Sequence, residues 1–467
     1  MFQKLLIAAS IYLMIIIGLA LYSRKGERTS KNYLMAGSSL GGLLGMFTFA
    51  ASLFSTFTLM GMPDFFRVHG VGAWIFLAFS DALMVFGVIW FGYYLRKSVK
   101  ESQHEYLGMA GFMEQRFQSK WVGYLMFLGV FIFLVPYVAI QIRGISIFLN
   151  QVFPDALPLW VWAVGLVVVM LVYSELGGLK AIIYSDILQG ILLLIVVWII
   201  GVFCLKSLGG IEAMFDQVEA KNDKLLSVPG PNGLFTLQFF IGSAMGIMLL
   251  PFSQPHISTR IMIMKDNKSL YRMALGLGFF AILVILPTAF IGMYGAINYA
   301  DLSPAEFLGK TLINDQSEII AVLVTIGLIA AAISTSDSLL FALGGELRSL
   351  LKGEDKQMVN IARIAIVFFG VVCLIFALLS NDQLVLLART SFAGTSILAP
   401  LIFTGILVKN PALHKWLAIP TLIGLLLFVC SSLGVLPKVY FGIRAEIMIP
   451  IVLGLIAFMT VFILPND

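Results

Sequence analysis

Residues 330–338 read Ala-Ala-Ala-Ile-Ser-Thr-Ser-Asp-Ser and lie inside a hydrophobic segment that starts near Ile319. Successive residues of a helix are about 100° apart, so four of these side chains share one face and a carboxylate lies at its edge. They are Ala331, Ser334, Thr335, Ser338 and, at the edge, Asp337. Carboxylates and hydroxyls are costly at membrane depth unless they meet an ion, a partner or water. The stretch therefore indicates either a row of oxygen ligands for a small cation or a close helix contact with hydroxyls bonded to the preceding turn.

The composition places this segment in a membrane. Of the 467 residues, 60% are hydrophobic and 12% are charged, and the mean hydropathy is +0.99. Soluble domains are about 45–50% apolar and about 25% charged. The chain is therefore predicted to be an all-α polytopic membrane protein. In a membrane protein, basic residues mark the cytoplasmic loops, so the net charge of +5 bears on orientation and does not indicate nucleic-acid binding.

Residue types for metal or hydrolytic chemistry are scarce. The cysteines lie in apolar segments and the histidines are scattered, which gives neither a disulfide framework nor a zinc-binding spacing. They are Cys204, Cys373, Cys430, His69, His104, His256 and His414. We therefore expect a protein that is not an enzyme, holds no prosthetic group and binds no nucleic acid.

At roughly 20 apolar residues per crossing, the hydrophobic segments predict about thirteen transmembrane helices. The first runs from about Leu5 to Tyr22. The others centre near Thr48, Phe86, Gly129, Val168, Ile195, Gly242, Ile282, Leu328, Phe369, Ser396, Leu425 and Leu455.

Basic residues cluster in four loops, which alternate with basic-poor loops such as 150–157. The clusters are Arg24, Lys25, Arg28 and Lys31; Arg96, Lys97, Lys100, Arg116 and Lys120; Arg260, Lys265, Lys268 and Arg272; and Arg348, Lys352, Lys356 and Arg363. The positive-inside rule assigns these loops to the cytoplasm. This predicts an N-terminus outside and a C-terminus inside.

Two hydrophobic segments are poor helices in their middles. The second contains Ala-Ser-Leu-Phe-Ser-Thr at 51–56 and Gly-Met-Pro at 61–63, and the seventh contains Gly-Ser-Ala-Met-Gly at 242–246 before Pro251. About five crossings separate them, so they run in opposite directions through the bilayer. Ordinary close packing explains one such segment. Two in matching positions favour the binding site of a transporter with inverted repeats.

Two further carboxylates lie inside predicted helices. Asp186 is about two turns beyond the Gly-Gly-Leu-Lys-Ala turn at 177–181, deeper than water reaches easily. It serves ion binding, pairs with Lys180 or caps a neighbouring helix. Asp81 follows Ser80 in the third segment and serves either helix packing or solute binding.

Four local patterns follow one another along the chain. Asn-Tyr-Leu-Met-Ala-Gly at 32–37 is similar to the loop sequence "DYFLAGR". Residues 177–189 are similar to "GGLKAVxWTDxxQ", residues 254–260 to "QPHIxxR", and residues 334–338 to "STxDS". Together they span most of the chain and are specific in combination. In these patterns the chain resembles the sodium/solute symporter family and is nearest to its proline/pantothenate-type branch.

The resemblance implies one membrane domain, 1–467, with the LeuT-type fold. Its two inverted five-helix repeats would be residues 41–207 and 208–410. Residues 1–40 would form an extra N-terminal helix and loop, and residues 411–467 two C-terminal helices.

The resemblance also implies where sodium binds. The site that the family shares corresponds to Ala51, Phe54, Ala331, Ser334 and Thr335, with carbonyl and hydroxyl oxygens as ligands. This set coincides with the polar face described above. Some relatives hold a second sodium beside the first, here at Asp186, Ser334, Asp337 and Ser338. Asp337 stands where the two-sodium sialic-acid carriers have a serine, and a like-charged pair of carboxylates sharing a site raises one pKa. The number of sodium ions is left open.

The expected solute site lies beside the first interrupted helix. Its candidate residues are Ser55, Phe57, Thr58, Ser80, Tyr137, Gln141 and Arg143. Thr58 is the only polar residue where sugar carriers place three, since Leu77 and Ile247 fill the other positions, and this argues against a sugar. Phe57 and Ile247 also depart from the proline branch.

Two arginines near the outer ends of apolar segments bear on the solute class. Arg143 and Arg389 would suit a solute carboxylate, which a guanidinium binds bidentately, or they extend to the outer interface. We therefore expect an amino acid or organic acid.

These features predict a sodium-coupled symporter that imports a small organic solute by alternating access. It would be a multi-pass protein of the cell (inner or plasma) membrane, in contact with the lipid bilayer and functional as a monomer. The alternative is a transporter-like sensor that binds solute and signals through a separate partner.

Overall fold

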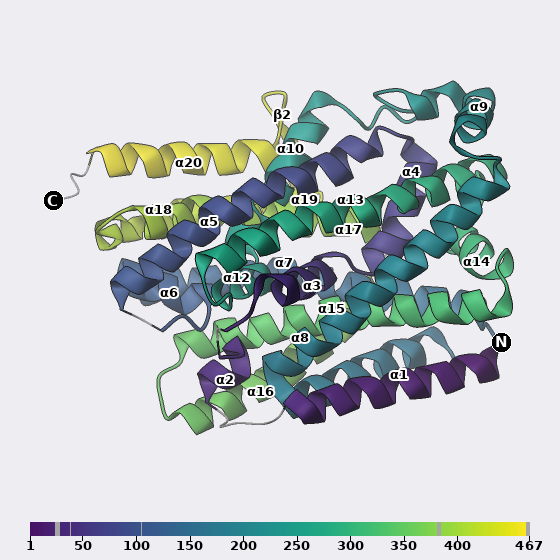
Figure 1. Cartoon of the computed structure of the whole chain (residues 1–467). Coiled ribbons are helices and arrows are strands. Elements are labelled where there is room, and N and C mark those ends of the chain that lie inside the picture. Colours follow the sequence, from purple (N-terminus) through teal and green to yellow (C-terminus); the bar gives the residue numbers. More distant parts are fainter. Residues whose placement is uncertain (24–28, 38, 104, 381–383, 464–467) are drawn as a thin grey trace.

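The computed structural model describes residues 1–23, 29–37, 39–103, 105–380 and 384–463. It is a bundle of helices that run roughly alongside one another (Figure 1). The longest helices are α1 (Phe2–Ser23), α5 (Ser80–Ser102), α7 (Lys120–Val152), α8 (Leu159–Ser207), α13 (Asn267–Asn298), α15 (Glu318–Leu350), α16 (Asp355–Leu379), α19 (Ala418–Ser432) and α20 (Ala445–Ile463).

Shorter elements connect or extend these helices. The α-helices among them are α2 (Ser30–Met35), α3 (Gly42–Leu53), α4 (Met62–His69), α6 (Met109–Phe117), α9 (Ile211–Asn222), α10 (Leu237–Met248), α11 (Leu250–Ser253), α12 (Pro255–Met262), α14 (Pro304–Gly309), α17 (Leu384–Ser396) and α18 (Ala399–Leu407). The π-helical segments are η1 (Phe57–Gly61), η2 (Ile75–Phe79) and η4 (Lys310–Asn314), and the 3-10 segments are η3 (Asp223–Leu226) and η5 (Pro411–Leu417). Strands β1 (Val439–Tyr440) and β2 (Ile443–Arg444) form an antiparallel hairpin.

The number and length of the apolar helices are those of a multi-pass membrane protein. In the described residues, ten helices are long and apolar enough to cross a membrane. Together, α3, η1 and α4, which are bent by 57°, make an eleventh if they form one broken span. The predicted fifth and sixth crossings correspond to the two helices within α8, which meet at a kink at Gly178. The predicted seventh crossing contains the shorter apolar helix α10. The number of thirteen crossings stays a prediction.

The interruption of α8 has a steric cause. Gly178 has φ +63° and ψ −155°, a conformation that favours glycine. A Cβ atom on Gly178 would lie 2.7 Å from Cδ2 of Tyr33 and 2.8 Å from its carbonyl oxygen. Tyr33 belongs to α2, so the Gly-Gly pair allows α2 to pack directly against the kink.

Helix α15 lies at the centre of the bundle. Most residues between Ala321 and Glu346 are buried, and the helix packs against α8, α7, α16 and α6. Its apolar and small residues surround the whole helix, as expected for a helix without a solvent-facing side. The polar stretch at 330–338 therefore lies in the interior of the protein.

One buried carboxylate fixes the last turns of α15 to a neighbouring helix. Glu346 accepts hydrogen bonds from the backbone N–H groups of Met109 at 2.8 Å and Ala110 at 2.6 Å. These are N–H groups of the first turn of α6, which have no partner within their own helix. Glu346 thus caps α6.

The start of α1 and the end of α20 lie at opposite ends of the bundle (Figure 1). Each predicted repeat begins with a broken helix, α3–η1–α4 in the first and α10–α11–α12 in the second. The repeat boundaries and the assignment of either end to the cytoplasm stay predictions.

Candidate functional site

The first broken helix opens its backbone in the protein interior. Helix α3 ends at Leu53, Phe54 is extended with ψ 111°, and π-helical η1 begins at Phe57. Side chains take up the N–H groups at this break. The Ser55 N–H donates to Thr58 Oγ1 at 3.1 Å, and the Phe57 N–H donates to Ser55 Oγ at 3.2 Å.

A neighbouring helix supplies the third acceptor. The Thr56 N–H donates to Oε1 of Gln141 on α7 at 3.1 Å. The Tyr137 hydroxyl, one turn earlier on α7, donates to the Leu53 carbonyl at 3.5 Å. Polar side chains of α7 therefore satisfy backbone groups at the break that a regular helix would bond internally.

Helix α15 meets α3 at the carbonyl of Ala51. The Ser334 hydroxyl donates to this oxygen at 3.0 Å and the Thr335 hydroxyl at 3.2 Å. Phe54 and Ala331 lie three residues away along α3 and α15, and both are buried. Three of the five residues predicted to bind sodium thus have their oxygens in direct contact. Carbonyl and hydroxyl oxygens are the hard, neutral donors that suit an alkali-metal cation, so the residues fit the ion.

The guanidinium of Arg260 lies among the residues predicted to form the second sodium site. The Asp186 carboxylate accepts hydrogen bonds from Ser334 at 2.6 Å on Oδ1 and from Thr48 at 2.5 Å on Oδ2. Nη2 of Arg260 lies 3.3 Å from Oδ2 of Asp186 and 2.6 Å from Oγ of Ser338. Asp186 is therefore paired with Arg260, and neither Lys180 nor a helix cap explains its burial.

Asp337 does not join this cluster. It is buried, and neither of its carboxylate oxygens accepts a hydrogen bond among the described residues. It interacts electrostatically with the hydroxyl of Tyr12 on α1, which accepts a hydrogen bond from Gln189 Nε2 at 2.7 Å. The structure thus brings together Asp186, Ser334 and Ser338, and the charges of Asp337 and Asp186 both act on the Tyr12 hydroxyl.

The prediction that Arg260 belongs to a cytoplasmic basic loop is wrong. Arg260 lies within α12 and is 1% exposed. Counting basic residues by sequence cannot separate a loop arginine from one at a buried helix end. The nearby Lys265 and Lys268 are exposed, as expected of a basic loop.

Most of the predicted solute-binding residues lie around the break. Ser55, Phe57, Thr58, Tyr137 and Gln141 are buried there and linked by the contacts given above. The Tyr137 ring packs edge-on against Phe392 of α17 at 5.0 Å between centroids and tilts against His256 of α12 at 6.4 Å. Aromatic rings from three helices therefore meet at this position.

Ser80 and Asp81 begin α5, and both are buried. The charge of Asp81 acts on the hydroxyl of Tyr137, one of the predicted solute-binding residues.

The two arginines considered for a solute carboxylate lie against protein groups. Arg143 is half-buried and donates from Nη1 to the carbonyls of Ala377 and Leu378, at the end of α16, at 3.3 and 3.5 Å. Arg389 of α17 forms an ion pair with Glu446 of α20 and lies over the Phe239 ring at 4.4 Å. These contacts tie neighbouring helices together.

Three residues of the site are not among the sequence candidates: Thr48, Ser52 and Arg260. The Ser52 hydroxyl lies 2.7 Å from the Thr48 carbonyl oxygen and 3.1 Å from Ser338 Oγ, and the side chains of Thr48 and Arg260 contact Asp186 as given above. Thr48 and Ser52 are one turn apart on α3, on the face that carries Ala51, and this spacing is the signal available in the sequence. Arg260 is the last residue of the pattern at 254–260. That pattern supported the family resemblance, but no function was assigned to its arginine from the sequence.

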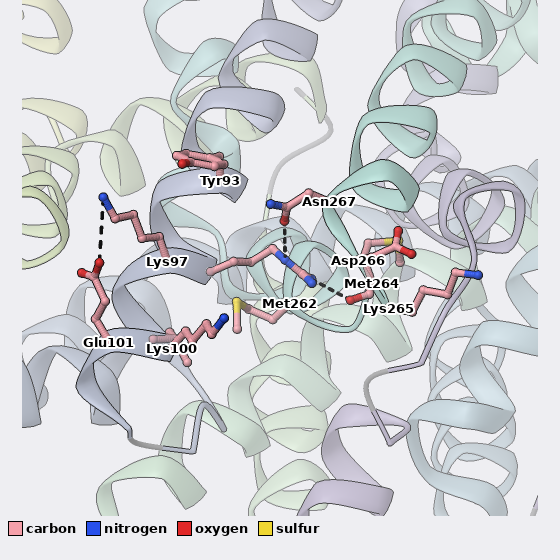
Figure 2. A pocket seen from close by; sticks show the side chains of 11 residues that line it. Tyr93, Lys97, Lys100, Glu101, Met262, Met264, Lys265, Asp266 and Asn267 are labelled. Carbon is pink, nitrogen blue, oxygen red and sulfur yellow. Dashed lines mark hydrogen bonds and ion pairs between the residues drawn. The ribbon is translucent and has the colours of Figure 1, made fainter.

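A separate cavity of about 830 Å³ lies between the end of α5 and the turn from α12 to α13. Figure 2 shows Lys97, Lys100 and Lys265 around it, and Arg96 donates to Met264 O at 2.6 Å and to Asn267 Oδ1 at 3.1 Å. Asp266 caps α13, and hydrogen bonds from the backbone and side chain of Ser269 lower its pKa. Its lining includes no predicted site residue among those the structure describes, so this basic cavity is distinct from the solute and sodium residues.

A family model described as "Sodium:solute symporter family" matches residues 33–411. The chain belongs to the sodium:solute symporter family. Sodium is therefore its coupling ion, and it is a multi-pass membrane symporter.

Curated relatives within this family are transporters rather than enzymes. The chain is 22% identical over 442 residues to the osmoregulated proline transporter OpuE of Bacillus subtilis, covering 90% of this chain and 87% of the relative. It is 24% identical over 436 residues to the high-affinity proline transporter PutP of the same organism, covering 88% of each. It is 24% identical over 301 residues to the sodium/pantothenate symporter of Haemophilus influenzae, covering 62% and 59%.

Two solved structures share the fold of this chain. A Na⁺-coupled sialic acid symporter in a substrate-bound outward-open state matches with a TM-score of 0.81 at 16% identity, covering 99% of this chain and 98% of that one. MhsT in complex with L-phenylalanine matches with a TM-score of 0.55 at 13% identity, covering 94% and 99%. The chain therefore has the helical architecture of these LeuT-like transporters.

Proposed function

We propose that this symporter imports a small carboxylate-bearing solute together with sodium, and that sodium binds between α3 and α15. The contact of Ser334 and Thr335 with the Ala51 carbonyl carries this proposal. The carbonyl groups of Phe54 and Ala331 complete the proposed ligand set. Sodium would bind to both helices and hold α3 and α15 at a fixed separation.

The solute class follows from the relatives and from the residues at the break. Proline, pantothenate and sialic acid, the solutes in the names of the similar proteins, all carry a carboxylate. The proposed solute residues Thr58, Tyr137 and Gln141 offer hydroxyl and amide groups, whereas Leu77 and Ile247 are apolar and buried. An amino acid or organic acid with a modest apolar body fits this mixture better than a sugar does.

The proposed cycle uses two linked binding events. Sodium enters from outside, driven by its gradient and by a membrane potential equivalent to about 2.3 kcal/mol per charge at 100 mV. Its binding stabilises the arrangement of α3 and α15 in which the solute residues face one another, so each ligand raises the affinity for the other. The broken helices then move relative to the rest of the bundle and release both ligands inside.

The test removes both hydroxyls from the proposed sodium site. We expect Ser334→Ala with Thr335→Ala to abolish sodium-stimulated uptake of a radiolabelled amino-acid and organic-acid panel into proteoliposomes. Ser336→Ala is the matched control, because Ser336 is buried on the same helix but its hydroxyl has no hydrogen-bond partner among the described residues. Sodium-stimulated uptake by the double variant equal to that of the control would overturn the site.

The same assay separates a symporter from a sensor. A sensor would bind a solute of the panel without accumulating it, whereas the proposed function requires concentrative uptake that collapses when the sodium gradient is dissipated.

A further inference from the structure

The basic cavity between the end of α5 and the turn from α12 to α13 has walls that are held in place by hydrogen bonds. Nη1 of Arg96 on α5 donates to the carbonyl oxygens of Ile261 at 3.2 Å and Met264 at 2.6 Å. Nε of the same guanidinium donates to Oδ1 of Asn267 at 3.1 Å. The backbone of Leu40 also pairs with this turn at Met264. The helix end and the turn therefore form a fixed pocket between them.

The lining of this cavity has a net positive charge. Of the described residues that line it, four are basic and two are acidic, so the carboxylates cannot neutralise the cations. Asp266 caps α13 with its carboxylate, and Glu101 forms an exposed pair with Lys97 at 3.8 Å, a kind of pair that is weak. Lys97 and Lys100 extend from α5, and Lys265 extends from the turn (Figure 2). The cavity thus has the chemistry of a site for an anion.

The outer face of α5 leads from the apolar part of the membrane to this cavity. Phe86, Trp90 and Tyr93 are exposed and lie four and then three residues apart, which places them on one face of the helix. Lys97 follows four residues after Tyr93 and is also exposed. A molecule lying along this face would contact aromatic rings first and then an ammonium group.

Helix α13, which packs against α5, has a similar outer face. Tyr271, Leu275 and Phe279 are exposed at intervals of four residues, and Asn267 of the cavity precedes Tyr271 by four. Tryptophan and tyrosine are enriched where a membrane meets water. The tryptophan and tyrosines on these two faces therefore place the cavity at the depth of the lipid headgroups.

We propose that this cavity binds the headgroup of an anionic phospholipid, whose acyl chains lie along the outer faces of α5 and α13. Basic pockets between transmembrane helices are suited to such headgroups. A zwitterionic lipid gains little from the net positive charge, and a soluble anion gains nothing from the apolar faces. The site is separate from the proposed sodium and solute residues and does not depend on their assignment.

A bound headgroup would link two parts of the bundle. Lys97 and Lys100 belong to α5, whereas Lys265 follows α12, the last part of the second broken helix. A phosphate held by lysines from both sides would stabilise their contact. A ligand that binds the folded protein raises its melting temperature, so occupancy can be measured as a thermal shift.

The first experiment compares three probes on the purified full-length protein in a non-ionic detergent. We expect dioleoyl-phosphatidylglycerol to raise the melting temperature saturably. Dioleoyl-phosphatidylcholine has the same acyl chains with a zwitterionic headgroup, and glycerol 3-phosphate has the phosphate without acyl chains, so both should fail to reproduce this rise. An equal rise with phosphatidylcholine would overturn the proposal, and an equal rise with glycerol 3-phosphate would identify a site for a soluble anion instead.

The second experiment assigns the effect to the cavity. In Lys97→Gln with Lys100→Gln and Lys265→Gln, three cavity cations are removed while Arg96 is kept, because Arg96 holds the turn. We expect the phosphatidylglycerol concentration for half-maximal stabilisation to rise roughly tenfold or more, since each basic residue near a membrane surface adds to the attraction of anionic lipid. If this variant does not fold, Lys97→Gln with Lys100→Gln should show a weaker change in the same direction.

The matched control removes three exposed lysines from other predicted basic loops, in Lys120→Gln with Lys352→Gln and Lys356→Gln. It should keep the wild-type concentration dependence. An unchanged dependence in the folded cavity variant would overturn the proposal, and so would an equal loss in the control, which would show attraction to charge in general. Both readouts are independent of transport, so failure of the proposed sodium symport would leave them unchanged.

Discussion

Asp81 places a carboxylate next to the residues proposed to bind solute. It is buried at the start of α5 and interacts electrostatically with Tyr137. If the solute is an amino acid, we propose that this carboxylate pairs with its ammonium group. We expect Asp81→Asn to raise the amino-acid concentration for half-maximal uptake by roughly tenfold or more, because a hydrogen bond to a charged group contributes about 1.5–3 kcal/mol.

Uptake is measured first as a function of solute concentration at saturating sodium, and then as a function of sodium concentration at saturating solute. The sodium dependence at saturating solute should be unchanged, since Asp81 contacts none of the proposed sodium ligands. Asp64→Asn serves as the control, because Asp64 is paired with Arg67. An unaltered solute concentration dependence in Asp81→Asn would assign Asp81 to helix packing.

Single residues also show where sequence reasoning stops. The face carrying Ser334, Thr335 and Ser338 follows from helical spacing, and the depth of Asp186 follows from its distance into a hydrophobic segment. The partner of Asp186 does not follow, because Arg260 is 74 positions away and its burial depends on how α12 packs. A pattern of local charges contains no information about such a contact.

At the scale of elements, the kink in α8 depends on Gly178. We expect Gly178→Ala to destabilise the protein, because an alanine at φ +63° costs about 1–3 kcal/mol in backbone strain and its Cβ would overlap Tyr33. The change should lower the melting temperature of the purified protein in detergent. Gly165→Ala in the same helix is the matched control, because a Cβ there meets no atom within 4 Å.

Alanine in an ordinary helical position is more favourable than glycine by roughly 0.5–1 kcal/mol, so the control should melt at the same temperature or slightly higher. Equal melting temperatures for the two variants would mean that α2 is not packed against the kink as described.

The broken helices were predictable as elements, whereas their internal bonding was not. Serine, glycine and proline in the middle of a hydrophobic segment indicate an interruption at 51–63. The Thr56 N–H donates to Gln141, which lies 85 positions away along the chain on α7, so this contact depends on how α7 packs. For α8, the sequence predicts two crossings, and the structure has two helices there that meet at the non-helical Gly178.

At the scale of the whole molecule, the arrangement of the chain ends agrees with an odd number of crossings. The start of α1 and the end of α20 lie at opposite ends of the bundle (Figure 1). Hydropathy predicts the class of protein and the path of the chain well, because only helices satisfy their backbone groups within lipid in a chain of this composition. The number of crossings stays a prediction, because broken and short helices such as α10 do not reach the length of a regular span.

The orientation is a separate prediction, since it rests on the basic loops. Two exposed positions in segments predicted to face opposite sides test it. Phe441 lies in the hairpin before α20 and is 98% exposed, and Lys97 lies near the end of α5 in a basic cluster. We expect Phe441→Cys to react with a membrane-impermeant maleimide on intact cells, and Lys97→Cys to react only after the membrane is permeabilised.

Both substitutions would be made in a chain whose three native cysteines are replaced by alanine. The reason for the expected pattern is energetic, since basic loops are retained on the cytoplasmic side whereas a basic-poor loop is translocated. The reverse labelling pattern would invert the orientation, and sodium would then enter the site between α3 and α15 from the end of the bundle where α20 terminates. Labelling of both positions from outside would contradict the helix count between them instead, because α5 and the hairpin would then end on the same face of the membrane.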